Sequence, residues 1–493
     1  MTPEAWALLA LTVAAAALRF GTISSQSYWF DEALTAHELR LPFGAMLSSL
    51  TTHETNPPLY YVIGWLWARV FGTGEVSLRF ISALAGTAVI PITYACGREL
   101  VSRRAGLLAA ALAAVSPFMV WYSQEARSYM LLSALCGASL LFAARWRRRG
   151  SRVDLAWWAG ASSLAVLTHF FAGFLILPEA VWLLWRDRAV FGGPAVDRRR
   201  DALIAVGCVA VVQAALLPLI IHDASHPISS WIAGFPRSIR LKQVPIQFAF
   251  GTLYRGSLVD YGWAVGIGTA LVVGGMIAFG GSERERRGAA ILAWLAGFVL
   301  IVPVLLALLG HDYIDARNLM PAWIPLAVLV GAACTAARLR VVGSALAAVL
   351  LGLFVIAGAR VAQSPQYERP NWRAVASALG KPAGARAIVA YDGAFAAGPL
   401  AIYLRGVPWL PTEQPAAALS ELDIVGSTWQ TPTQPLPAGI RLLGSKAVDT
   451  MLVERFAVGP WLRLAPAAIA ARATSLLVPA PPNPLVVIQR VSR

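Results

Sequence analysis

Two adjacent carboxylates, Asp31 and Glu32, follow the first apolar segment of the chain almost without a linker. They stand among aromatic residues at 27–33, where a membrane span is expected to reach water. A carboxylate just above the hydrocarbon region can accept a proton from a hydroxyl group held against it, which is general-base catalysis. Alternatively, both acids are solvated loop residues or cap an interfacial helix. We favour catalysis, because charged groups at membrane depth are costly and usually face a cavity.

A second acidic position precedes another apolar stretch. His53 and Glu54 come just before residues 57–67, which open with two prolines and are too short and too aromatic to span a bilayer comfortably. Prolines suit the first turn of a helix, so this stretch predicts a helix lying in the membrane interface. His53, Glu54 and Tyr60 could line the same cavity as Asp31. They could equally cap and pack the interfacial helix.

Two arginines at expected membrane boundaries could hold a phosphate group. Arg127 stands among aromatic residues, with Glu125 before it and Tyr129 after it. A guanidinium group can bind phosphate bidentately, although Arg127 could instead be an interfacial anchor paired with Glu125. Arg317 opens a later apolar segment and offers the same choice, because Asp315 is close in sequence and could pair with it.

Other polar residues carry weaker signals. Lys242, in a stretch rich in prolines and aromatics, is a third candidate for binding phosphate. The group His222, Asp223 and His226 has residue types that bind metals, but its spacing matches no known metal motif, so we expect no metal ion there. Phosphate-binding loops, dinucleotide-binding glycine motifs and serine nucleophile elbows do not stand out, so soluble-nucleotide chemistry has little support.

The composition is that of a polytopic membrane protein. Of the 493 residues, 57% are hydrophobic and only 14% are charged, which excludes the ordinary soluble class. The net charge of +15 would suggest nucleic-acid binding in a soluble protein. Here the arginines fall in short clusters between apolar runs, a pattern of membrane topology, and we expect no nucleic-acid partner.

The spacing of the apolar runs predicts an α-helical bundle of about eleven transmembrane helices, since a bilayer core needs roughly 20 apolar residues per helix. The predicted spans are residues 5–23, 77–97, 105–122, 128–145, 154–168, 170–186, 202–222, 258–280, 289–309, 319–337 and 341–360. If the N-terminus is cytoplasmic, alternate loops hold far more arginine than the others, and the positive-inside rule places Asp31 outside. We therefore expect a multi-pass protein of the inner (plasma) membrane with an extracytoplasmic active site.

The chain divides into two predicted domains. Residues 1–361 form the transmembrane domain, with outer loops at 24–76 and 223–257. From residue 362 hydropathy falls and prolines multiply, while residues 387–390, 423–425 and 485–488 have the pattern of short buried strands. Residues 362–493 are therefore expected to form a small α/β domain. The odd number of spans places it outside the membrane as well.

Several motifs occur in a telling order. They are the Asp-Glu pair after the first span, Asn-Pro-Pro-Leu-Tyr-Tyr at 56–61, Leu-Arg-Phe at 78–80, Tyr-Ser-Gln-Glu-Ala-Arg-Ser-Tyr at 122–129 and Asp-Ala-Arg-Asn-Leu-Met-Pro at 315–321. In this order, over roughly residues 1–340, the chain resembles the family-39-like membrane glycosyltransferases. That group has the GT-C fold. It includes bacterial relatives of protein O-mannosyltransferases and of the aminoarabinose transferase that acts on lipid A.

The resemblance implies an enzyme that transfers a sugar from a polyprenyl-phosphate donor to a hydroxyl group of a lipid, glycan or protein acceptor at the outer membrane face. Asp31, with Glu32 beside it, would match the catalytic aspartate of the first outer loop, and Glu54 the second acidic position. In several relatives a lysine follows that second acid, whereas Thr55 and Asn56 follow it here. Phosphate binding would then fall elsewhere, on Arg127, Arg317 or Lys242.

The implied mechanism is a single inverting displacement with Asp31 as general base. Phosphate is already a good leaving group, so no acid catalyst and no cofactor is required, and a divalent metal is possible but optional. The alternative function is a transporter or flippase for a lipid-linked glycan. We favour the transferase, because no inverted repeat is visible and the acids lie in the outer loops rather than in the middle of spans.

Overall fold

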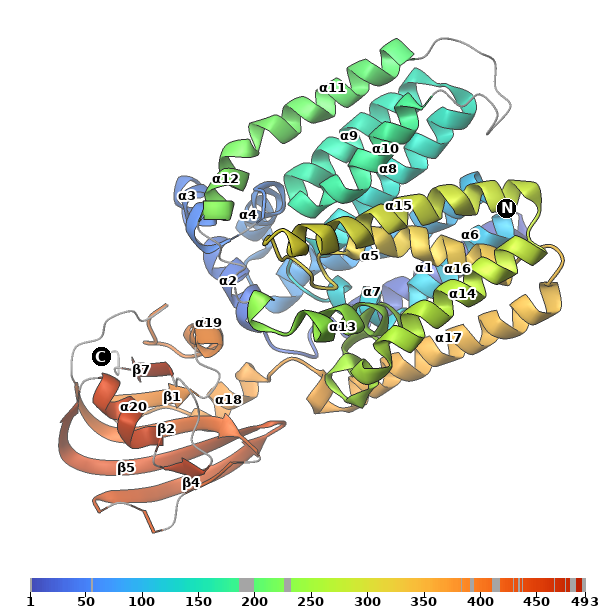
Figure 1. The fold of residues 1–493 in the computed structure, drawn as a ribbon. Helices are drawn as coiled ribbons and strands as arrows, with labels where there is room; N and C mark the ends of the chain where they lie inside the picture. The colour runs from blue at the N-terminus through green and yellow to red at the C-terminus, as the bar shows by residue number, and fades with distance from the viewer. Residues whose placement is uncertain are drawn as a thin grey trace. The chain divides into compact units, whose positions relative to one another are not determined.

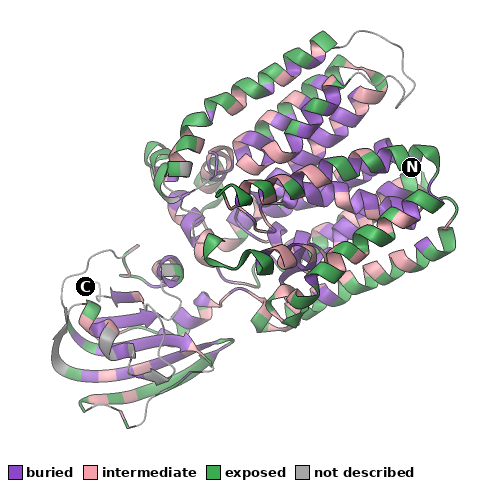
Figure 2. Cartoon of the chain, viewed as in Figure 1, coloured by how far each residue is buried: buried purple, intermediate pink, exposed green. Residues whose placement is uncertain are grey.

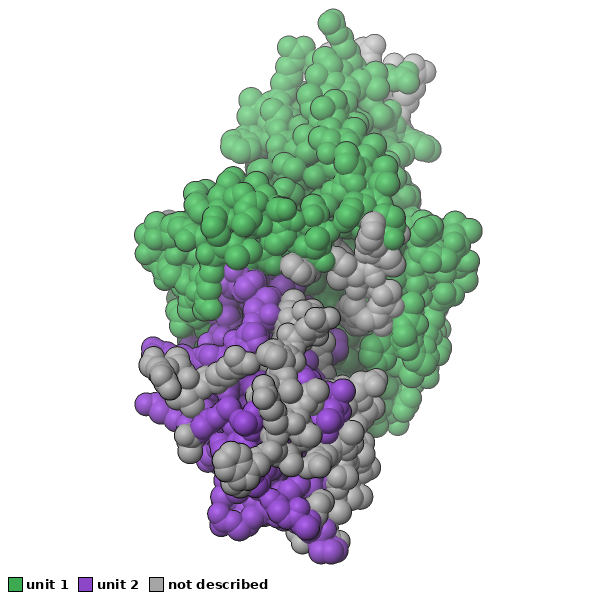
Figure 3. Space-filling model, turned by 90° about the vertical axis from the view of Figure 1, so that its left-hand side faces the viewer, with its two compact units in different colours: residues 1–23, 38–363 green, residues 24–37, 364–493 purple. Residues whose placement is uncertain are grey.

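The structure of the protein is a computed structural model. Its chain divides into two units. The described residues are 2–54, 56–185, 199–225, 232–382, 384–390, 394–409, 417–428, 430–432, 435–436, 438–464, 466–474, 476–478 and 485–489. Unit 1 comprises residues 1–23 and 38–363, and unit 2 comprises residues 24–37 and 364–493 (Figure 3).

Unit 1 is built from helices (Figure 1). They are α1 (Pro3–Gly21), α3 (Phe43–His53), α4 (Leu59–Phe71), α5 (Glu75–Leu100), α6 (Arg103–Val115), α7 (Pro117–Ser123), α8 (Tyr129–Arg149), α9 (Arg152–Thr168), η1 (Phe170–Ala172), α10 (Gly173–Leu184), α11 (Arg199–Ala215), α12 (Leu217–Ser225), α13 (Arg237–Phe250), η3 (Gly251–Arg255), η4 (Ser257–Tyr261), α14 (Gly262–Gly280), α15 (Glu283–Leu308), η5 (Met320–Ala322), α16 (Trp323–Cys334) and α17 (Arg340–Gln363).

The predicted helical membrane architecture is confirmed. Each predicted span coincides with a helix or with a pair of helices joined at a bend. Within the described ranges, six helices are long and apolar enough to cross a membrane, and counting each of two bent pairs as one span gives up to eight. The remaining predicted spans fall on shorter helices, among them α9 of 17 residues and α16 of 12 residues. Helix α4 forms where the interfacial helix is predicted and has 13 residues.

Burial in unit 1 follows the pattern of a bundle surrounded by lipid (Figure 2). The most apolar stretches of α1, α14 and α17 are only 11%, 6% and 11% buried, and their exposed surface is apolar, as lipid contact requires. In contrast, α8 is 72% buried. Helices α5 and α6 touch through glycines: a Cβ added to Gly97 would lie 2.5 Å from the Cα of Gly106. Small residues of this kind let membrane helices approach closely.

A break between α6 and α7 is stabilised by a buried arginine. Pro117 has no N–H to donate to the carbonyl of Ala113, so the helix bends by 58°. Arg19, which is fully buried at the end of α1, donates from Nη2 to the Ala113 oxygen at 3.0 Å and from Nη1 to the Ala114 oxygen at 3.0 Å. The break therefore leaves no orphaned carbonyl at these positions, and it directs α7 toward the loop that precedes α8.

Unit 2 contains a five-stranded sheet in the order β4-β5-β2-β1-β7. The strands and helices are β1 (Arg386–Ala390), β2 (Ala417–Ser427), β4 (Ile440–Val448), β5 (Met451–Leu464), β7 (Leu485–Gln489), α2 (Phe30–Glu38), η6 (Pro365–Tyr367), α18 (Trp372–Leu379), α19 (Ala394–Tyr403) and α20 (Pro466–Thr474), with a small second sheet of β3 (Thr431–Pro432) and β6 (Leu477–Val478). Strand β1 is parallel to β2 and antiparallel to β7.

The predicted α/β domain is confirmed, and the three predicted strands are neighbours at one side of the sheet. Side chains of β1 alternate between two cores, as the period of a strand requires. Ile388 and Ala390 pack with α18 and α19, whereas Ala387 and Val389 pack with α20. Strands β4 and β5 are not apparent from the sequence because they lie toward the sheet edge, where β4 is mostly exposed.

The division into units differs from the predicted domains at one place. The boundary near residue 363 is close to the predicted boundary at 361, but residues 24–37, expected within the transmembrane domain, belong to unit 2. The reason is a set of hydrogen bonds to the C-terminal domain, such as the one from the Tyr28 N–H to the Tyr403 hydroxyl oxygen at 2.7 Å.

Candidate active site

A buried ion pair joins the loop before α4 to the loop before α8. Glu54 follows the last residue of α3, and its side chain is only 2% exposed. Arg127, 7% exposed, donates from both terminal nitrogens to this carboxylate, with Nη2 and Oε2 3.1 Å apart. Asn56 Nδ2 donates to the same carboxylate at 3.2 Å, and the Tyr61 hydroxyl oxygen lies 3.1 Å from Arg127 Nη1. Two charges buried this deeply require such hydrogen-bonding partners.

The backbone around Arg127 is fixed by neighbouring helices. Ser82 Oγ of α5 donates to the Arg127 carbonyl at 3.1 Å, and Gln124 Nε2 donates to the Arg19 carbonyl at the end of α1 at 3.0 Å. The Arg127 N–H donates to the Glu125 carbonyl at 2.8 Å. Glu125 itself is buried. Arg127 is thus paired with Glu54, 73 residues away. The alternative interpretation, in which Arg127 pairs with Glu125, did not include this contact.

A second arginine and three aromatic rings lie beside this pair. The Arg317 guanidinium carbon is 5.8 Å from the centre of the Tyr129 ring. The Tyr129 ring centre is 5.3 Å from that of Tyr122 and 5.7 Å from that of His169. His169 lies close enough to Arg127 and Arg317 for both positive charges to interact with its ring. The structure therefore groups the predicted residues Glu54, Arg127 and Arg317, from the loops after α3, α7 and α15, with Tyr129, the first residue of α8.

Arg317 also has the acidic neighbour that its alternative interpretation named. Its Nε lies 3.7 Å from Asp315 Oδ1, an ion-pair distance that is longer than a hydrogen bond. The Arg317 side chain is 15% exposed, about twice the value for Arg127. Because its side chain is the more exposed, Arg317 is the more accessible of the two guanidinium groups for an anionic ligand.

Asp223 of α12 adds a further acid. It lies close enough to Glu54 for the two carboxylates to repel each other, and the adjacent His222 ring Nε2 is 2.8 Å from the Thr51 carbonyl oxygen. The third member of the suggested metal-type group, His226, lies outside the described residues. Among the residues that the structure describes, no cluster of three metal-ligating side chains is present.

The remaining predicted residues of unit 1 are placed less centrally. Lys242 of α13 lies 4.0 Å from Asp260 of η4, whose side chain is 74% exposed. Tyr60 is buried in α4 with its ring centre 5.8 Å from that of Tyr61, and Tyr61 is the one that contacts Arg127. The side chain of His53 and all of Thr55 lie outside the described residues.

Asp31 and Glu32 occupy the first turn of α2 in unit 2. Asp31 is half-buried and Glu32 is fully buried. The N-terminus of a helix carries a partial positive charge, which favours negatively charged carboxylates in the first turn. The helical capping role that the alternative interpretation gave these acids is therefore compatible with their position. It does not conflict with proton acceptance by the half-exposed Asp31.

A further polar cluster is not apparent from the sequence. Arg240 of α13 donates to both carboxylate oxygens of Asp312, from Nη1 and Nη2 at 2.7 Å each, and Arg237 Nε donates to Oδ2 at 3.2 Å. The hydrogen bonds from Arg240 lower the pKa of Asp312 to about 2. These residues border an open cavity of about 440 Å³ together with residues 233–236. Asp312 is visible as a loop acid in the sequence, but its partner is 72 residues away.

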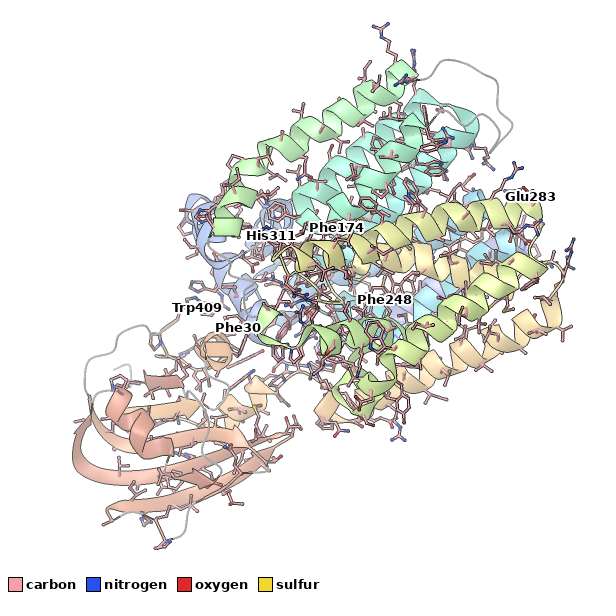
Figure 4. All side chains as sticks on the ribbon, in the orientation of Figure 1. Phe30, Phe174, Phe248, Glu283, His311 and Trp409 are labelled. Carbon is pink, nitrogen blue, oxygen red and sulfur yellow. The ribbon has the colours of Figure 1, made fainter. Side chains whose placement is uncertain are left out.

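The charged ends of the bundle differ in character. Glu99 lies at the C-terminal end of α5. The guanidinium groups of Arg145, Arg148 and Arg149, at the C-terminal end of α8, surround it. Glu283 is the first residue of α15, and His311 lies just after its last residue. Both are labelled in Figure 4, where they mark the two ends of this long helix. The cluster of Glu54, Arg127, Tyr129 and Arg317 thus lies at the end of the bundle where α9 and α15 have their last residues.

Comparison with known proteins identifies a region that holds part of this cluster. Residues 55–218 match the family model described as dolichyl-phosphate-mannose-protein mannosyltransferase. The matched region contains Tyr61, Arg127, Tyr129 and His169. Glu54 lies immediately before it. No curated protein matches the chain in sequence.

Solved structures of membrane glycosyltransferases are also similar. ArnT from Cupriavidus metallidurans bound to undecaprenyl phosphate has 15% identity and a TM-score of 0.47 over 70% of this chain. The oligosaccharyltransferase AglB from Archaeoglobus fulgidus has 15% identity and a TM-score of 0.44 over 77% of this chain. The arabinofuranosyltransferase AftD from Mycobacteria has 16% identity and a TM-score of 0.47 over 93% of this chain.

The chain spans 62%, 58% and 40% of the lengths of these three proteins. The family match falls on the same motifs, at 56–61 and 122–129, that carried the resemblance in the sequence. The predicted resemblance to the GT-C membrane glycosyltransferases is thereby confirmed over residues 55–218.

Proposed function

We propose that this chain is a glycosyltransferase that moves a sugar from a polyprenyl-phosphate donor to an acceptor hydroxyl group at the outer face of the membrane. The observation that carries the proposal is the buried Glu54–Arg127 pair with Arg317 and Tyr129 beside it, at the edge of a region that matches a family named for a dolichyl-phosphate-mannose donor. An arginine-rich, aromatic-lined cluster at the ends of apolar helices suits a phosphate group attached to a lipid.

The proposed step is a single displacement with Asp31 as general base. The acceptor hydroxyl gives its proton to the Asp31 carboxylate while its oxygen forms a bond to the anomeric carbon of the sugar. The bond from that carbon to the phosphate oxygen breaks, and polyprenyl phosphate leaves with the electron pair. Because attack and departure occur on opposite sides of the carbon, the anomeric configuration is inverted.

Arg317 is the group that we assign to the departing phosphate, since its side chain is more exposed than that of Arg127. Preorganised positive charge is effective where negative charge develops in the transition state. Arg127 adds positive charge to the same cluster and is oriented by Glu54. Lys242 keeps a secondary place in this assignment, because Asp260 lies beside it. No cofactor is needed for this step.

The experiment that tests the proposal is donor cleavage by the purified full-length protein in lipid nanodiscs. The donors are a panel of polyprenyl-phosphate sugars, offered with candidate lipid, glycan and peptide acceptors. We expect release of free polyprenyl phosphate and formation of a glycoside whose anomeric configuration, read by NMR, is opposite to that of the donor. The Arg317→Gln variant should lose most of this activity, because the leaving phosphate loses its counter-charge.

Two results would contradict the proposal. A product with the donor's configuration would exclude a single displacement. Movement of an intact fluorescent lipid-linked sugar between the leaflets of proteoliposomes, without any cleavage across the panel, would favour the alternative flippase function. Glu283→Gln is the control variant, because Glu283 is an exposed acid at the start of α15.

A further inference from the structure

The segment that leads into α2 is bonded to the C-terminal domain within unit 2. Arg373 Nη2 donates to the carbonyl oxygens of Ser24 and Ser25, at 3.1 Å and 3.2 Å. The Arg369 N–H donates to Gln26 Oε1 at 3.2 Å. These contacts join residues at the start of the segment to residues at the start of α18 and just before it, more than 340 positions later in the chain.

The next two residues continue the same series. Ser27 Oγ donates to the Pro370 carbonyl at 3.1 Å, and the Tyr28 N–H donates to the Tyr403 hydroxyl oxygen at 2.7 Å. Tyr28 is almost fully buried. Residues 24–28 are thus each hydrogen-bonded to residues 369–403. The backbone is fixed up to three residues before Asp31.

The helix itself rests on the same domain through two aromatic contacts. The ring centres of Phe30 and Phe395 are 5.2 Å apart in an edge-to-face arrangement. About two helical turns further along, the His37 ring stacks on the Trp409 ring. The ring centres are 4.0 Å apart and the planes are 2° from parallel. Figure 4 labels Phe30 and Trp409 on this part of unit 2. Such aromatic pairs add to the free energy gained from burying apolar area.

A glycine allows the middle of α2 to approach α19. A Cβ added to Gly398 would lie 3.3 Å from the Cβ of Ala33 and 3.0 Å from a ring carbon of Trp409. Contacts this short leave no room for a larger side chain. Gly398 is therefore where the two helices meet most closely.

These contacts share one face of α2 and leave both acids off it. Positions 30, 33 and 37 follow the spacing of a single helical face. At about 100° per residue, Asp31 and Glu32 each point roughly 130° away from the centre of that face. The contacts of Phe30, Ala33 and His37 with the C-terminal domain therefore lie on a face of α2 that does not include its carboxylates.

We propose that Gly398, Tyr403 and Trp409 of the C-terminal domain are positioning residues that hold α2 and thereby aim Asp31. This inference rests on the proposed function for its catalytic consequence. A catalytic group must be held close to its productive geometry, and a displacement of about 1 Å can cost roughly a hundredfold in rate. The domain acts here through α2.

The first test is structural and independent of activity. In a Cys208→Ser background, which removes the exposed native cysteine, the pair Ala33→Cys and Gly398→Cys should form a disulfide on mild oxidation of the full-length protein in membranes. The close approach of the two Cβ positions suits a disulfide. Peptide mapping by mass spectrometry detects the linked peptides. Ala33→Cys with Gly459→Cys is the control pair and should stay reduced.

The second test separates positioning from folding. Tyr403→Phe removes only the hydroxyl oxygen that accepts the Tyr28 N–H, and Gly398→Val pushes α19 away from α2. We expect kcat to fall by about tenfold in the first variant and about a hundredfold in the second, while KM for the donor is unchanged. The controls are Tyr367→Phe and Gly459→Val, since a Cβ at Gly459 meets nothing within 4 Å.

The outcomes distinguish this inference from the proposed function. A disulfide between positions 33 and 398 supports it, because these positions come within bonding distance only when α2 lies against α19. A disulfide that fails to form in an active protein overturns it. Equal kcat in Tyr403→Phe, Gly398→Val and their controls also overturns it. If wild type cleaves no donor but the disulfide forms, the proposed function fails, while the holding contact stands.

Discussion

At the scale of single residues, the Glu54–Arg127 pair is the most informative feature of the cluster. Burying two charges costs several kcal/mol per ion, and a close pair offsets that cost only with good geometry and further hydrogen bonds. Asn56 and Tyr61 supply those hydrogen bonds. An apolar pair of similar volume would be as stable or more stable, so the charges indicate a role beyond stability.

Removing one partner of this pair should destabilise unit 1 strongly. Glu54→Gln leaves the Arg127 charge buried without its counter-charge, and we expect a loss of about 3–5 kcal/mol in the free energy of unfolding. The double variant Glu54→Gln/Arg127→Met should recover part of this loss, because no buried charge remains. Denaturant unfolding in detergent micelles measures both.

The matched control is the exposed pair Arg152–Asp201, in which the side chains are 83% and 27% exposed. Asp201→Asn should cost less than about 1 kcal/mol, because solvent screens a surface pair. Equal losses from Glu54→Gln and Asp201→Asn would show that the Glu54–Arg127 pair is not buried in the folded protein.

At the scale of elements, Asp312 joins the start of α13 to the loop after α15. Its folded pKa of about 2 is below its ordinary value of 3.8, chiefly because of the hydrogen bonds from Arg240. When pH falls, the unfolded chain therefore takes up this proton before the folded chain does. The stabilisation from the pair is present above about pH 4 and is lost as pH falls toward 2.

Asp312→Asn should accordingly lower the unfolding temperature at neutral pH, and its unfolding temperature should change less than that of wild type between about pH 4 and pH 2. Thermal unfolding in detergent at a series of pH values measures this difference. Asp260→Asn, which alters an exposed carboxylate, is the control and should follow the wild-type curve. A parallel shift of the Asp312→Asn curve at all pH values would contradict the linkage.

The sequence predicts the position of most elements, because apolar runs and buried strands have strong local patterns. The helices from α5 to α17, except α13 within the predicted outer loop 223–257, and the strands β1, β2 and β7 occur where the hydrophobic pattern indicates them. The bend at Pro117 and its partner Arg19 could not be predicted, since the arginine that bonds the free carbonyls lies 94 residues earlier. Strand β4 lies at the sheet edge and is mostly exposed, so it carries too weak an alternation of burial.

Individual site residues follow from the sequence better than their pairing does. Glu54, Arg127 with Tyr129, and Arg317 come from three separate segments of the chain, and the structure groups them. Which residue pairs with Arg127, and that Tyr61 also contacts it, depend on how the helices pack. No local sequence pattern indicates that packing. For the same reason, the attachment of residues 24–37 to the C-terminal domain is visible only in the fold.

At the scale of the whole molecule, the account requires both the acid cluster and the C-terminal domain to lie outside the membrane. In a Cys208→Ser background, Lys446→Cys on the exposed strand β4 should react with a membrane-impermeant maleimide in intact cells. Arg103→Cys, in the predicted inner loop before α6, should react only after the membrane is permeabilised, because arginine-rich loops remain cytoplasmic. The reverse labelling pattern would place the C-terminal domain inside and contradict the topology.

The central claim is that Asp31 takes the proton of the acceptor during sugar transfer. Its most direct test is single-turnover transfer from bound polyprenyl-phosphate sugar by wild type, Asp31→Asn and the control Glu283→Gln in nanodiscs. The account predicts that Asp31→Asn binds the donor as wild type does but transfers about 100 to 10,000 times more slowly, while Glu283→Gln keeps the wild-type rate. A wild-type rate in Asp31→Asn would contradict it.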